Sequence, residues 1–387
     1  MGAADALRVI ADRHGMQGQY AEAIVTYQDA LNILKGTGEI RKTGSILNNM
    51  AIGFAAEGNL QGAEKLYREA QSHFEQAGDQ FNTATALGNI ADVLYSRGQL
   101  TGATKLYKQS MEIESRLEPN NPGYELYRLA DLELAQGRVQ EAQRLAEQSV
   151  DVLKREQGAY QYVTGAMIEL GEIFEAEGNL TAARQQFEGT ISPRQKIGSL
   201  ALLAESQVDL AQLDLEEGHP DRAEHLLRKA IPEFEKENAD PDLANAYLLL
   251  SRVLLQQGKL EEARDAFARA VKLSRTNPAP ALKLPLAMQH ARLEIAPGNA
   301  VSGMTLTAAR RELHAVAASA AKLGYYRIQC EARLELSEIE AKINPDASRA
   351  QLTSLAAEAR SRGLELVARK AEQGLTSMTD LVALTHR

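Results

Sequence analysis

Apolar residues recur along the chain at helical spacing on both sides of a glycine. The stretch around Gly58 shows the pattern most clearly, with apolar positions at Leu47, Met50, Ala51 and Phe54 before it and at Leu60, Ala63, Tyr67 and Ala70 after it. Steps of three and four residues place such positions on one face of a helix. Each stretch of this kind is therefore predicted to form two antiparallel helices that bury their apolar faces against each other.

The glycine repeats every 39 to 41 residues, at Gly18, Gly58, Gly98, Gly137, Gly178, Gly218, Gly258 and Gly298. Glycine adopts the left-handed backbone of a tight turn at no steric cost. Alanine follows five residues later in the first seven repeats, where a small side chain lets the two helices approach closely. The pattern predicts an all-α fold, an α-solenoid in which antiparallel helix pairs wind into a right-handed superhelix.

The regularity changes along the chain and suggests three regions. Residues 1–275 are expected to hold seven regular helix pairs, residues 276–324 an irregular eighth repeat behind a proline-rich link, and residues 325–387 a closing helix pair and a capping helix. The helices of the last region are expected over Tyr325 to Ile343, Asp346 to Arg362 and Leu364 to Glu372. Pro193 is expected to break or close the second helix of the fifth repeat. Because the chain starts almost inside a repeat, we expect it to be a segment of a longer protein.

The order leucine, small residue, aromatic, glycine, alanine, aromatic, alanine resembles the tetratricopeptide repeat (TPR) family, with a period near 40 instead of the commoner 34. The stretches 47–51 and 63–67 are similar to the long-repeat branch seen in kinesin light chains and bacterial peptide-sensing regulators. The stretches 178–183, 263–270, 331–336 and 366–371 resemble the C-terminal TPR regions of bacterial Ser/Thr kinases and winged-helix regulators. The resemblance implies that a protein or peptide binds in a concave groove.

In such stacks the first helix of each repeat lines the groove. The position nine residues before each glycine reads Val9, Asn49, Asn89, Arg128, Glu169, Asp209, Leu249 and Gln289, and the position six before reads Asp12, Ile52, Asp92, Asp131, Glu172, Gln212 and Arg252. The resemblance to the long-repeat branch implies that Asn49 and Asn89 hydrogen-bond the main chain of an extended peptide, since an amide both donates and accepts. The candidate groove residues are Asn48, Asn49, Asn89, Asp92, Tyr95, Tyr127, Arg128, Asp131, Glu169, Glu172 and Asp209.

The middle of these two rows is mostly acidic, and Glu175, Glu205 and Asp214 stand near it in the sequence. We therefore hypothesise an acidic groove that prefers a basic segment of a partner. The alternative is that these charges form a solvated helix face. In the same way, Tyr95, Tyr124 and Tyr127 either wall the groove or pack between repeats.

Composition narrows the range of partners. The net charge of −9, without a basic stripe, disfavours binding of nucleic acid or of anionic membranes. A single cysteine, Cys330, excludes an intrachain disulfide and a Cys-based zinc site, and it is expected to be a buried structural thiol. The seven histidines lack paired ligand spacing, so no metal or cofactor is expected. No apolar run approaches the about 18 residues of a membrane helix, so we expect no membrane insertion and a cytoplasmic location, with an extracytoplasmic region of a larger protein as the alternative.

The sequence offers no convincing catalytic motif. Residues 36–43 nearly match a phosphate loop, but Arg41 stands in place of a required glycine and no strand precedes it, so a loop between helices is predicted. Kinase signatures are missing. These observations favour a non-enzymatic protein interaction scaffold. The alternative is the regulatory sensor region of a bacterial signalling kinase or transcriptional regulator whose effector domain is absent from this chain.

Overall fold

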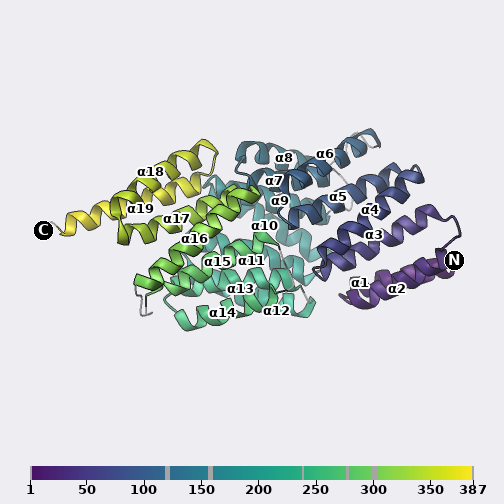
Figure 1. Cartoon of the computed structure of the whole chain (residues 1–387), viewed down its shortest axis with the longest axis horizontal. Coiled ribbons are helices and arrows are strands. Elements are labelled where there is room, and N and C mark those ends of the chain that lie inside the picture. Colours follow the sequence, from purple (N-terminus) through teal and green to yellow (C-terminus); the bar gives the residue numbers. More distant parts are fainter. Residues whose placement is uncertain are drawn as a thin grey trace. The chain divides into compact units, whose positions relative to one another are not determined.

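The computed structural model describes residues 2–117, 123–155, 160–237, 239–275, 279–297 and 303–385. Every regular element in these ranges is an α-helix (Figure 1), and consecutive helices pack as antiparallel pairs, for example α3 with α4 and α11 with α12. The predicted all-α stack of helix pairs is thereby confirmed.

The chain forms two compact units. The first comprises Met1–Leu129 and Thr276–Pro280, and the second comprises Ala130–Arg275 and Ala281–Arg387. The first unit contains α1 (Ala3–Met16), α2 (Tyr20–Leu34), α3 (Ile40–Ala56), α4 (Leu60–Gln76), α5 (Gln80–Ser96), α6 (Leu100–Leu117) and the first half of α7 (Gly123–Ala135). This partition differs from the three regions expected from the repeats, which stay a prediction.

The second unit contains the remaining helices. They are α8 (Val139–Leu153), α9 (Tyr160–Ala176), α10 (Leu180–Ile197), α11 (Leu200–Glu216), α12 (Pro220–Glu237), α13 (Asp240–Gln256), α14 (Leu260–Leu273), nearly all of α15 (Pro280–Glu294), α16 (Gly303–Leu323), α17 (Tyr326–Ile343), α18 (Pro345–Ser361) and α19 (Glu365–Thr385). Within the described residues, no helix is both long and apolar enough to cross a bilayer.

The repeated glycine forms a left-handed turn between the two helices of a pair. At Gly58 the backbone φ is +78°, and the next residue, Asn59, donates its backbone N–H to the carbonyl of Phe54 at 2.9 Å. The Asn59 side chain then caps α4 by accepting the N–H of Gly62 at 2.9 Å. The other repeat glycines have the same positive φ, except Gly298, which lies outside the described residues. The predicted helix, glycine turn and helix are confirmed.

The core of each pair is built from the expected small and aromatic positions. In the second repeat Ala63 is fully buried, and Tyr67 and Phe74 are almost fully buried. In the second unit Ala223 and Leu227 take the same positions. Alanine at the crossing point brings the helices close enough for the aromatic residues on either side to fill the remaining space. This packing fixes where the first helix of each pair lies, and these first helices line the candidate site.

Pro193 does not end α10, contrary to the sequence prediction, because the helix continues to Ile197. The next residue, Arg194, is 2% exposed and anchors this last turn to α11. It donates to the carbonyl of Leu202 at 2.5 Å and to the carboxylate of Glu205 at 2.9 Å. These charge-assisted bonds offset the one backbone hydrogen bond that proline removes.

The closing helices also differ from the expected ranges. The sequence predicts that the last helix ends at Glu372, but α19 continues to Thr385. It passes through Gly374, where an added Cβ would lie 3.1 Å from Leu352 of α18. A glycine inside a helix costs only about 1 kcal/mol, and the close packing on α18 offsets that cost.

We predict that Gly171→Ala lowers the stability of the second unit. A Cβ at this position in α9 would lie 2.4 Å from the ring of Phe187, which is 1% exposed and cannot move aside. Overpacking of this kind costs about 1–3 kcal/mol, which outweighs the helix propensity gained. The matched control is Gly88→Ala in α5, where the nearest atom is 3.7 Å away and a small gain is expected. Calorimetric melting of both variants tests this, and a Gly171→Ala protein that melts at or above the wild-type temperature contradicts it.

Candidate functional site

The predicted groove residues fall into two groups, one in each unit. The first unit holds Asn48, Asn49, Asn89, Asp92, Tyr95, Tyr127 and Arg128, and the second holds Asp131, Glu169, Glu172 and Asp209. All of them lie on first helices of the repeats, α3, α5, α7, α9 and α11.

The asparagines of the first unit join neighbouring repeats. Asn49 donates its side-chain N–H to Asp12 Oδ1 of α1 at 3.1 Å, and Asn89 donates to Asn48 Oδ1 of α3 at 2.9 Å. Tyr27 donates its hydroxyl to the same Asp12 oxygen at 2.6 Å. The amide groups are thus partly engaged by the chain itself, which the sequence did not indicate. Their contact with a peptide main chain stays a prediction.

Asp92 is the centre of a second cluster in the first unit. It accepts hydrogen bonds from the hydroxyls of Tyr107 and Tyr124 and from the guanidinium of Arg128. Burial, followed by the charge of Asp92, raises the pKa of Tyr107 well above its ordinary value. The guanidinium also lies over the rings of Tyr95 and Tyr127, at 5.8 and 6.0 Å from their centres. This cluster ties α5, α6 and α7 together, and whether Tyr95, Tyr124 and Tyr127 also wall a groove stays a prediction.

Carboxylates from α9 and α11 gather on one face of the second unit. We call them the acidic cluster, and they are Glu169, Glu172, Glu175, Glu205, Asp209 and Glu216. Burial and the nearby Glu216 raise the pKa of Glu175 to about 7, and burial and Glu172 raise that of Asp209 well above its ordinary value. Burial also raises the pKa of Glu205 to about 7 although Arg194 is bound to it. The Oδ2 atom of Asp209 is buried without a hydrogen-bond partner among the described residues.

Cations from the closing helices face the acidic cluster. Arg327 of α17 lies 3.8 Å from Glu172, and Lys370 of α19 pairs with Glu216. Burial lowers the pKa of Arg327, but Glu331 and Glu172 raise it more, so the guanidinium is held in its charged form. The sequence prediction missed these two residues. Charges on the expected closing helices were visible in the sequence, but their pairing with α9 and α11 was not.

The same face becomes basic towards α13 and α15. Arg252 donates to Gln212 Oε1 at 3.0 Å and lies 3.8 Å from Glu216, and Arg292 pairs with Glu335 of α17 at 2.5 Å. The hypothesis of an acidic groove is therefore narrowed to α9 and α11, and the whole face has an acidic end and a basic end.

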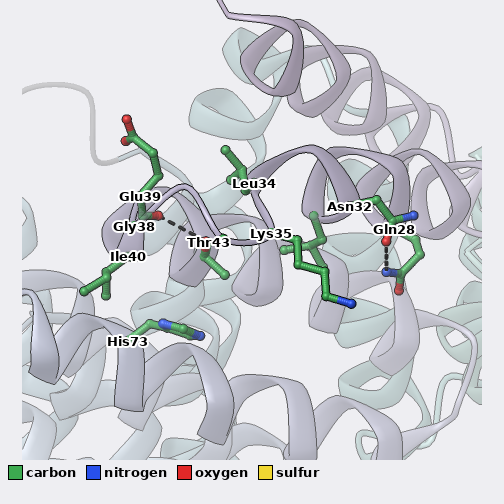
Figure 2. A pocket seen from close by; sticks show the side chains of 11 residues that line it. Gln28, Asn32, Leu34, Lys35, Gly38, Glu39, Ile40, Thr43 and His73 are labelled. Carbon is green, nitrogen blue, oxygen red and sulfur yellow. Dashed lines mark hydrogen bonds between the residues drawn. The ribbon is translucent and has the colours of Figure 1, made fainter.

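A hollow of about 420 Å³ lies in the first unit at the loop between α2 and α3 (Figure 2). Gly36, Gly38 and Thr43 line it, so it includes the segment that nearly matches a phosphate loop. Two pairs of its polar groups are bonded to each other: Gln28 donates to Asn32, and the Thr43 hydroxyl donates to the carbonyl of Glu39 at 3.0 Å. The segment joins two helices, as predicted.

Two further observations concern reactive groups. Among the described residues, no group of His, Cys, Asp and Glu side chains is arranged to hold a metal ion. Cys330 on α17 is fully buried, and burial raises the pKa of its thiol to about 11. The prediction of a buried structural thiol is confirmed.

We predict that the second unit loses stability as the pH rises from about 5 to about 8. Glu175 faces Glu172 on its own helix, Gln212 and Glu216 on α11, and Arg327 on α17. Its folded-state pKa of about 7 exceeds the unfolded value of about 4.3. The folded state therefore binds more protons in this window, and the free energy of unfolding falls as pH rises.

Melting temperatures of wild type and Glu175→Gln across this pH range measure the effect, and the variant should show a flatter dependence. Glu358→Gln is the control, because hydrogen bonds from Arg333 and Ser354 hold the pKa of Glu358 at about 2, outside the window. Equal slopes for wild type and Glu175→Gln would contradict the assignment.

Comparison with known proteins supports the fold. Residues 42–114 match the family described as tetratricopeptide repeat, and residues 146–371 match the MalT-like TPR region. No curated protein sequence gives a significant match.

Several solved structures are similar. A Rap protein complexed with competence and sporulation factor aligns with a TM-score of 0.60 at 12% identity, covering 98% of each chain. The Rap conjugation gene regulator of plasmid pLS20, in complex with the Phr* peptide, aligns with a TM-score of 0.60 at 11% identity, covering 96% of this chain and 97% of the other. Aspartyl phosphate phosphatase F from Bacillus subtilis aligns with a TM-score of 0.53 at 11% identity, covering 94% and 96%. At these identities the likeness concerns the fold.

The MalT-like match extends over more than half of the chain and includes the acidic cluster as well as α17 and most of the closing region. The glycine turns, the buried alanines and the antiparallel pairs are those of a TPR stack. The chain is a tetratricopeptide repeat protein and belongs to the family of MalT-like TPR regions.

Proposed function

We propose that this chain is a non-enzymatic scaffold that binds a peptide or helix of a partner protein on the face formed by the first helices of its repeats. The observation that carries the proposal is the acidic cluster. Six carboxylates from two adjacent first helices gather on one face, and Arg194, Arg252, Arg327 and Lys370 are cations that meet them. Such a face selects a ligand by charge.

The electrostatics favour a basic ligand. The raised pKa values of Glu175 and Asp209 arise from burial and from repulsion between neighbouring carboxylates. A cation placed among them relieves this repulsion and favours the ionised form. A partner segment with lysine or arginine therefore gains interaction energy there that a neutral segment does not.

Two of the structural neighbours support the same mode of action. Both Rap structures are complexes, one with competence and sporulation factor and one with the Phr* peptide. These ligands belong to those proteins, and they support the proposal that a stack of this fold can hold a peptide. The ladder of Asn48, Asn49 and Asn89 in the first unit is proposed as a second contact surface, for the main chain of an extended segment.

We predict that peptides selected on the full chain by display of a random library carry lysine or arginine that meets the acidic cluster. The combined variant Glu172→Gln, Glu175→Gln and Asp209→Asn should bind them at least about tenfold more weakly, since three carboxylates of the acidic cluster are neutralised. Affinity measured by fluorescence anisotropy at two salt concentrations tests this.

The matched control neutralises Asp151 and Glu188, which are exposed on the second helices α8 and α10. It should leave the affinity unchanged. Loss of binding in the control alone, or selection of peptides that lack both lysine and arginine, would rule out recognition by the acidic cluster.

We also predict that Asn49→Ala and Asn89→Ala weaken binding of a selected peptide in addition to a stability cost of about 1 kcal/mol from each lost hydrogen bond between repeats. Crosslinking identifies the bound peptide. Anisotropy measured at equal concentrations of folded protein then gives the loss of peptide affinity apart from the loss of stability. Unchanged affinity in both variants would remove the asparagine ladder from the binding surface.

A further inference from the structure

The charged face of the second unit is already covered by helices of the same chain. Arg327 of α17 faces Glu172 of α9, and Lys370 of α19 pairs with Glu216 of α11. These are the contacts that a basic partner would make. The closing helices therefore occupy the surface on which the proposed function depends.

The charges along α17 are opposite to those of the face that it meets, at both ends of the helix. Arg327, Glu331 and Glu335 are spaced four residues apart, so they lie along one side of the helix. Arg327 lies at the acidic end, and Glu335 pairs with Arg292 of α15 at the basic end. The charges of Glu331 and Glu335 also act on Arg252 of α13. The basic end of α17 thus meets the acidic end of the face, and its acidic end meets the basic one.

Close backbone contacts fix this arrangement. The ring of Tyr326 packs on the turn at Gly137, where an added Cβ would lie 2.4 Å from the ring. Arg369 donates to the carbonyl of Gly178 at 3.1 Å, and a Cβ on Gly178 would lie 2.8 Å from its guanidinium. The turn at Gly363 packs in the same way on Val139 and Gln140 of α8. Two repeat glycines therefore serve both their own turns and the docking of the closing helices.

The closing helices bury apolar residues such as Ala332, Ile339 and Ala368, and their contacts with the charged face and the turns are polar. The polar contacts include ion pairs, hydrogen bonds from Arg362 and Arg369 to backbone carbonyls, and the Tyr326 ring, over which the Arg362 guanidinium stacks at 3.9 Å. Partly exposed ion pairs contribute about 0–1 kcal/mol each. At the charged face, a ligand that offers the same charges can therefore compete with α17 for these ion pairs.

We propose that α17, α18 and α19 form an intramolecular latch in which α17 occupies the binding face of the second unit until a partner helix of the same charge pattern replaces it. The partner is a helix with a basic residue followed by acidic residues one and two turns later. This inference rests on the proposed function, because it assigns a competitor to the same face. It adds that binding of the partner and release of the closing helices are coupled.

The test uses the full chain with Arg327→Glu, which places a like charge against the acidic cluster. Arg349→Glu is the matched control, since it makes the same change of charge at an exposed position of α18. Hydrogen exchange measures how fast the backbone amides of α17 exchange with solvent. Fluorescence anisotropy measures binding of a labelled synthetic peptide with the sequence of residues 325–343. Arg327→Glu should exchange α17 at least about tenfold faster than wild type and bind the peptide at least about tenfold more tightly. Arg349→Glu should resemble wild type in both measurements.

A charge swap provides the second arm. Adding Glu172→Arg to Arg327→Glu restores an opposite pair, so protection of α17 should return and peptide binding should fall. Circular dichroism verifies that each variant is folded, and Lys370→Ala replaces Arg327→Glu if that variant unfolds.

The outcomes separate the two proposals. Unchanged exchange of α17 in a folded Arg327→Glu variant overturns the latch, whatever peptides bind elsewhere. If α17 exchanges faster in Arg327→Glu but the peptide binds with wild-type affinity, α17 and the peptide do not compete for one surface. This outcome overturns the latch and leaves the proposed function standing. Failure of library-selected basic peptides to bind either wild type or Arg327→Glu overturns the proposed function itself.

Discussion

The close crossing of two helices at a buried alanine, after a left-handed glycine turn, is the contact on which the rest of the structure depends. Gly58 and Ala63 show it in the second repeat, and the same geometry returns in the other regular repeats. A side chain at the glycine would strain the backbone, and a larger side chain at the alanine would separate the helices. Because each pair has the same geometry, each first helix presents the same positions to its neighbours.

The residues that first helices present to their neighbours make different contacts in the two units. In the first unit, Asn49, Asn89 and Arg128 reach back to a residue of the preceding repeat and form polar ties between first helices. In the second unit the corresponding positions of α9 and α11 are carboxylates that repel one another. Carboxylates gathered in a partly buried place require cations. The chain supplies these from α10 and α13 and also from α17 and α19, and the last two help to hold the closing helices on the face of the unit.

The charge balance of this contact also explains how a stable fold can keep a usable binding surface. A face covered by apolar side chains would hold the closing helices too tightly for exchange. A face covered by matched charges is specific, because each charge must meet its opposite, and yet each pair contributes little net stability. The buried core of alanine, leucine and aromatic residues supplies the stability, so the charged face is free to serve recognition.

The sequence alone determined the helix pairs, the turns and the repeat register, because each depends on residues close together in the chain. Gly58, Ala63 and Tyr67 lie within ten residues of one another; Gly58 forms the turn, and the spacing of Ala63 and Tyr67 places them on one face of the helix that follows. It also indicated that Glu172 and Asp209 lie on first helices. It did not show that Arg194 would carry α10 past Pro193, because that depends on contacts with α11.

Only the tertiary structure decided which charges meet. Glu172 and Arg327 are far apart in the sequence, and no periodicity links them. Their contact follows from the way the last three helices fold back onto the turns at Gly137 and Gly178. A repeat pattern specifies how each unit packs on the next, but the docking of a non-repeating end depends on side chains that occur once. For this reason the fold was readable from the sequence, and the occupant of the charged face was not.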